Sequence, residues 1–63
     1  MKTTGKTAKE DLPAFREKHG KTLEKICEKT GVAISTLIAI EKDSVKPQSK
    51  TIYKLNKYLS LFD

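Results

Sequence analysis

The sequence is short of the residues that usually build catalytic and metal sites. Its 63 residues hold one cysteine, one histidine and no tryptophan. A lone cysteine excludes an intrachain disulfide, and Cys27 with His19 falls short of the four ligands that a structural zinc site takes. A single histidine without clustered carboxylates also gives no set of nucleophile, base and orienting group. We therefore expect no enzyme, no metal, no cofactor and no small-molecule substrate.

Long apolar runs are missing as well. No segment approaches the roughly 18 residues that a membrane helix needs, and no signal-peptide pattern follows Met1 and Lys2. Together with the single cysteine, these features favour a soluble chain in a reducing cytoplasm, without a membrane partner. At 63 residues the chain is long enough for one compact domain and too short for two.

Positive charge is what the sequence has in excess. Thirteen Lys and Arg against eight Asp and Glu give a formal net charge of +5. The excess lies in residues 1–9 and 42–57, whereas the charges of residues 10–31 cancel. Such a chain is expected to approach a polyanion or an acidic protein. Residues 1–6, rich in Thr, Gly and Lys, are expected to form a flexible basic arm before one folded domain over residues 7–63.

The spacing of apolar residues predicts an all-α fold of four helices. The first helix has two candidate starts. Thr7 has capping-box spacing to Glu10, whereas Asp11 as the cap would place Pro13 in the first turn. In both cases Gly20 ends the helix.

The other three helices have clearer signals. Thr22 is a good N-cap for a short second helix that Gly31 ends. A third helix covers residues 34–42 after a tight turn, with Leu37 and Ile40 toward the core, and an amphipathic basic helix begins at about residue 49. Two short helices joined by a glycine turn have the spacing of a helix-turn-helix.

The residues around this turn form an ordered set of short motifs. They are Thr22-Leu23-Glu24, Glu28-Lys29-Thr30-Gly31-Val32, Ser35-Thr36-Leu37, Ile40-Glu41-Lys42, Lys46-Pro47 and Thr51-Ile52. The set resembles the Cro and phage-repressor (XRE) type of helix-turn-helix domain over residues 12 to about 61. The resemblance implies a compact four-helix domain, here without the fifth helix that the family usually adds. It also implies a transcriptional regulator whose recognition helix starts near Ala33.

The resemblance also suggests which lysines touch phosphate. In the family, the loop before the position of Pro47 and the start of the fourth helix contact the DNA backbone. The candidate phosphate or acidic-partner contacts are Lys21, Lys42, Lys46, Lys50 and Lys54.

The base-reading positions of that family are unusual in this chain. They correspond to Ala33, Ile34, Ser35, Ile38 and Ala39. Only Ser35 can form a hydrogen bond through its side chain, whereas direct readout uses residues such as Arg, Asn and Gln. Ile34 and Ile38 are instead expected to form an exposed apolar pair. Such a pair, with Glu41, Lys42 and Lys46 at its rim, is typical of a protein-docking surface.

We therefore interpret the chain as a regulator whose recognition helix docks on a protein. The favoured partner is a repressor of the same family, so that the chain acts as an antirepressor or modulator in a bacteriophage genetic switch. The predicted contact residues are Ala33, Ile34, Ser35, Ile38, Ala39 and Lys42. The alternative is a Cro-like repressor that binds operator DNA through the same helix and the lysine-rich loop and last helix.

Two questions stay open at this point. Helix packing either leaves both Ile34 and Ile38 exposed or rotates one of them inward. Leu61 and Phe62 either fold back as a lid or pair with a second copy of the chain as a homodimer contact. The side chains expected to pack within the domain are Cys27, Tyr53 and Tyr58.

Overall fold

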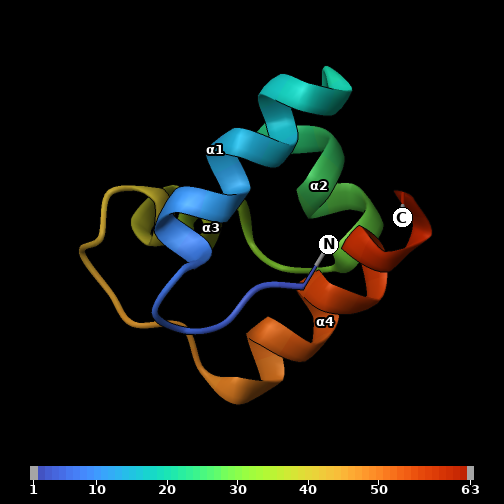
Figure 1. Ribbon diagram of the computed structural model, residues 1–63. Helices are drawn as coiled ribbons and strands as arrows, with labels where there is room; N and C mark the ends of the chain where they lie inside the picture. Colours follow the sequence, from blue (N-terminus) through green and yellow to red (C-terminus); the bar gives the residue numbers. More distant parts are fainter. Residues whose placement is uncertain (1, 63) are drawn as a thin grey trace.

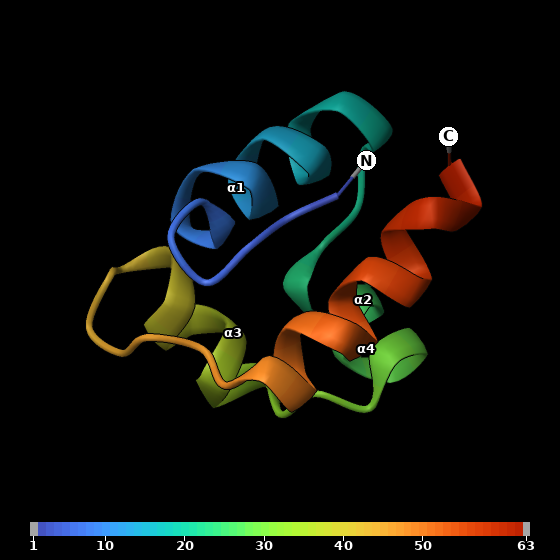
Figure 2. The same cartoon turned by 60° about the horizontal axis from the view of Figure 1, so that its bottom comes forward.

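The computed structural model describes residues 2–62, and every regular element in that range is helical. The elements are α1 (Ala8–His19), α2 (Leu23–Thr30), α3 (Ile34–Glu41), α4 (Ser49–Leu59) and a closing 3-10 turn, η1 (Ser60–Phe62). Figure 1 shows their order, and Figure 2 shows α1 lying above α3. The predicted all-α fold with four helices is confirmed. Met1, in the predicted arm, and Asp63, in the predicted domain, lie outside the described residues.

One core holds the helices together. It consists of Ala8, Leu12, Phe15, Ile26, Val32, Leu37, Ile40, Leu55, Tyr58 and Leu59. Spacings of three and four place the members from α1 and α4 on one face of each helix. Leu37 and Ile40 are both buried, as predicted, so the opposite face of α3 is left to solvent. Between residues 2 and 62 each helix is too short or too polar to span a bilayer.

The first helix starts at the earlier of its two candidate positions. Thr7 precedes α1, so Pro13 lies inside the helix. The expected capping box is wrong, because Thr7 Oγ1 accepts the Thr4 N–H at 3.1 Å and receives nothing from Glu10. The Glu10 N–H instead donates to the main-chain carbonyl of Thr7 at 2.9 Å.

The segment before α1, which its composition predicts to be a flexible basic arm, forms hydrogen bonds with α1 and α4. Thr3 is buried, and its N–H donates to Asn56 Oδ1 at 2.6 Å while Asn56 Nδ2 donates to the Thr3 carbonyl at 2.9 Å. The Thr3 hydroxyl donates to Asp11 Oδ2 at 2.7 Å. These bonds tie the segment to α4 and α1, and Figure 2 shows it running beside α1 before it turns into that helix.

The last two described residues, Leu61 and Phe62, differ in their packing. Phe62 folds back, with its ring centroid 5.0 Å from that of Phe15 and 5.1 Å from that of Tyr58, both edge-on. His19 lies 4.9 Å from Phe62 in the same cluster. Leu61 is instead 76% exposed. Phe62 therefore packs against the core, whereas Leu61 lies at the surface.

Candidate functional site

The turn between α2 and α3 is fixed by caps on both of its sides. Thr22 Oγ1 accepts the Lys25 N–H at 3.1 Å, which begins α2 as predicted. Gly31 ends that helix with a φ of 77°, and its N–H donates to the Cys27 carbonyl at 2.9 Å. Val32 is buried directly after it. The chain therefore enters α3 from a turn of defined direction.

An ion pair between α1 and the last turn of α3 holds the candidate recognition helix in place. Arg16 Nε and Nη2 donate to the two carboxylate oxygens of Glu41 at 2.8 and 2.7 Å. These hydrogen bonds to Glu41 raise the pKa of the Arg16 guanidinium above its ordinary value. The Glu41 side chain is only 13% exposed. The expectation that Glu41 forms part of the charged rim is therefore wrong, because its charge is engaged inside the domain.

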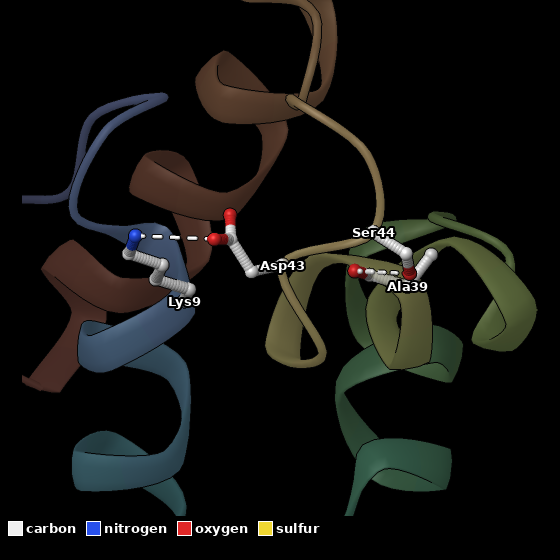
Figure 3. A network of polar contacts seen from close by, with 4 residues as sticks. All are labelled: Lys9, Ala39, Asp43 and Ser44. Atoms are coloured by element: carbon white, nitrogen blue, oxygen red, sulfur yellow. Dashed lines mark hydrogen bonds and ion pairs between the residues drawn. The ribbon is translucent and has the colours of Figure 1, made fainter.

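The end of α3 is closed by main-chain bonds beyond its last residue. The Ser44 N–H donates to the Ala39 carbonyl and the Asp43 N–H donates to the Ile40 carbonyl, each at 3.0 Å. This pattern is a Schellman motif with Asp43 in the left-handed conformation, at φ 57°. Figure 3 shows the Ser44 hydroxyl bonded to the same Ala39 carbonyl, at 3.1 Å, and Lys9 reaching Asp43, at 3.3 Å.

The outward surface of α3 is apolar, as the sequence predicts. Ile34 is 37% exposed and Ile38, one turn later, is 38% exposed, so neither has rotated inward. Ala33 and Ser35 are exposed beside them. We call these four residues the α3 face. Within it the Ser35 hydroxyl is the one side-chain group that can form a hydrogen bond.

The two remaining predicted contact residues lie at the margin of the α3 face. Lys42, directly after α3, is exposed, whereas Ala39 is half-buried. Lys46 is exposed in the loop before α4 and lines a hollow of about 290 Å³ together with Thr36 of α3. Lys46 therefore lies beside α3, the candidate recognition helix.

The structure does not bring the other candidate lysines to the α3 face. Lys50 and Lys54 line a separate groove between α2 and α4, together with Lys29 and Lys57. Lys21 is half-buried, with its Nζ 5.6 Å from the centroid of the Phe62 ring. The predicted basic set therefore divides among three places on the domain.

The groove, which has a volume of about 580 Å³, was not predicted from the sequence. Tyr58 is buried and Cys27 is half-buried against the core, in accord with their predicted packing. Tyr53 differs, because it is 69% exposed and lines the groove. The sequence signal that could have revealed the groove is the spacing from Lys50 through Tyr53 to Leu61, which marks one face of a helix.

Acidic and soft ligands are scattered over the domain. Within residues 2–62, no group of three His, Cys, Asp or Glu side chains is close enough together to hold a metal ion.

Comparison with known proteins identifies the architecture. A family model described as helix-turn-helix matches residues 14–61, a span that contains α2, α3 and α4. The chain belongs to the helix-turn-helix family. This helix-turn-helix protein is 36% identical over 53 residues to an uncharacterized HTH-type transcriptional regulator of Methanocaldococcus jannaschii, covering 84% of this chain and 80% of the relative. The resemblance to the Cro and phage-repressor (XRE) type is thereby confirmed. No solved structure gives a significant match.

Proposed function

We propose that this helix-turn-helix protein regulates transcription as an antirepressor, by docking the α3 face on a repressor of the same family and blocking that repressor's DNA binding. The observation that carries the proposal is the exposure of Ile34 and Ile38 on the recognition helix. In DNA-reading relatives this surface enters the major groove, where sequence is recognised through hydrogen bonds to base edges.

The chemistry of the α3 face favours a protein over a base pair. A bidentate side-chain contact to a base gives about 1–3 kcal/mol of discrimination, and the α3 face has no side chain able to form one. An isoleucine can only touch a thymine methyl. An uncharged apolar centre with Lys42 at its edge instead matches the anatomy of a protein interface, whose core is depleted in charge.

A repressor is the partner that we favour because the chain belongs to a family of transcriptional regulators. A member of that family without base-reading side chains needs another regulator through which to select a promoter. Covering the DNA-reading surface of a repressor would change transcription directly. The bacteriophage genetic switch is the setting in which we place this role.

The test compares the wild-type chain with the variant Ile34→Asp/Ile38→Asp. Both chains are used to capture helix-turn-helix repressors from the native host or lysogen, and the recovered repressor is then bound to its own operator in a mobility-shift assay. We expect the wild-type chain to displace the repressor from its operator. The variant should need at least about tenfold more protein for the same displacement, because its introduced carboxylates would be buried in the interface.

Val45→Asp is the matched control, since Val45 is an exposed apolar residue outside the α3 face. Ile34 and Ile38 are only 37% and 38% exposed, so the double variant loses part of their packing, and thermal melts by circular dichroism must show that each chain is folded. Release by the Ile34→Asp/Ile38→Asp variant as efficient as wild type would contradict the proposal, as would the absence of any retained helix-turn-helix repressor.

Operator binding by the chain itself is the second candidate function. Lys42 and Lys46 support it, because both are exposed and neither forms an ion pair among residues 2–62. Contacts of lysine to phosphate are strong at low salt and carry no sequence information directly. Sequence preference would then have to come from DNA shape.

A further inference from the structure

The groove between α2 and α4 is a second surface, distinct from the α3 face. It has a volume of about 580 Å³ and no residue of α3 lines it. Its charged walls come from Lys29, Lys50, Lys54 and Lys57. Within residues 2–62 no acidic side chain lines the groove, and none of these lysines forms an ion pair.

The groove also exposes large apolar groups between its lysines. Tyr53 is 69% exposed and Leu61 is 76% exposed, so both present apolar surface at the groove. The buried Tyr58 lies at the groove as well. The aliphatic stems of the lysines add apolar surface while their ammonium groups stay in water. The occupant must therefore combine negative charge with apolar side chains.

The groove is elongated along α4. A stripe of groove residues begins at Lys50. The others follow it at spacings of three, four, seven and eleven, and they are Tyr53, Lys54, Lys57 and Leu61. At about 1.5 Å per residue this stripe is about 16 Å long, the length of an eleven-residue helix. Its shape suits a helical segment better than a compact small molecule.

We propose that this groove binds an acidic amphipathic helix of a partner protein. Its apolar residues contact Tyr53 and Leu61, and its carboxylates face the lysines on both walls. This is the helix-in-groove mode of recognition, with charge complementarity setting the orientation of the partner.

Two other possible occupants fit the groove less well. A second copy of this chain, with its formal net charge of +5, would bring lysines against lysines in a symmetric contact. A single strand of nucleic acid would use the lysines and the Tyr53 ring, but it would leave the exposed Leu61 without an apolar partner.

The experiment titrates the full ¹⁵N-labelled chain with a synthetic capped 14-residue peptide. The peptide carries leucine at four positions with spacings of four, three and four, and glutamate on both sides of that stripe. We expect amide shift changes at Lys29, Tyr53, Lys57 and Leu61, and none at Ile34. Fluorescence anisotropy of a labelled peptide gives the dissociation constant, which should rise at least about tenfold between low and high salt.

Variants of equal charge change separate the groove from the net charge. We expect Lys54→Glu/Lys57→Glu to weaken binding at least about tenfold, and Lys6→Glu/Lys18→Glu, on exposed residues outside the groove, to weaken it less than about threefold. Tyr53→Ala should weaken it at least about fivefold, since exposed aromatics become anchors in interfaces. Thermal melts by circular dichroism check that each variant is folded.

Results of three kinds would overturn the inference. One is the absence of shift changes at the groove with about 1 mM peptide, or an equal response to a peptide whose leucines are scrambled. Another is tighter binding of a twelve-residue oligothymidylate at the same residues, which would assign the groove to single-stranded DNA. The third is concentration-dependent shifts at Tyr53 and Leu61 without peptide, which would assign it to a second copy. None of these results bears on the α3 face, so the two proposals fail separately.

Discussion

At the scale of single residues, two ion pairs between α1 and the α3 region differ in what they contribute. Arg16 and Glu41 are joined by two parallel hydrogen bonds, and their side chains are 32% and 13% exposed. Lys9 and Asp43 share one contact of 3.3 Å, with side chains 42% and 67% exposed. Solvent screens the second pair far more than the first, so only the first should orient α3.

We predict that Glu41→Gln lowers the free energy of unfolding by about 1–2 kcal/mol, because it leaves a half-buried guanidinium without its carboxylate. Urea unfolding followed by circular dichroism measures the loss. Lys9→Ala is the control and should change stability by less than about 0.5 kcal/mol. Equal losses in the two variants would mean that the Arg16–Glu41 pair has no special role in placing the recognition helix.

At the scale of elements, the helix-turn-helix unit is the part that local sequence specifies best. Thr22 caps α2, Gly31 ends it, and the apolar spacing places Leu37 and Ile40 in the core, each as predicted. These signals involve residues within a few positions of one another. Local chemistry therefore suffices to predict both the turn and the face that α3 leaves exposed.

Gly31→Ala should destabilise the domain by about 1 kcal/mol, which lowers the melting temperature by about 4–8 °C. An added Cβ at Gly31 meets no atom within 4 Å, so the cost comes from the backbone φ of 77° alone. Thermal unfolding measures it. Gly5→Ala is the matched control, since its Cβ would make only ordinary contacts, the nearest at 3.6 Å to the Pro47 carbonyl. A melting temperature unchanged by Gly31→Ala would show that the turn tolerates another backbone conformation.

Elements whose position depends on distant residues were predicted less well. Thr3 pairs with a side chain 53 residues away, which composition cannot reveal, and its neighbour Thr4 takes the Thr7 hydroxyl away from the expected capping box. Tyr53 is exposed because α4 turns its Leu55 and Leu59 face inward, leaving the residue on the groove side. In a chain this small, tertiary packing decides which of several apolar residues enters the core.

At the scale of the whole molecule, the α3 face and the groove between α2 and α4 differ in their charge. The α3 face carries no charge, whereas the groove between α2 and α4 collects four lysines. The net charge of +5 therefore does not concentrate on the helix that reads DNA in relatives. A basic chain of this family can approach DNA without recognising a sequence, since nonspecific affinity depends on lysine and arginine contacts to phosphate.

The central claim, that α3 contacts protein instead of reading bases, is tested most directly by selection from a randomised duplex DNA pool. Binding of the selected and random duplexes is then measured by fluorescence anisotropy at two salt concentrations. We expect no enriched sequence, a ratio of selected to random affinity below about tenfold, and weak binding that falls steeply with salt. An enriched motif bound at least about a thousandfold more tightly than random DNA would contradict it.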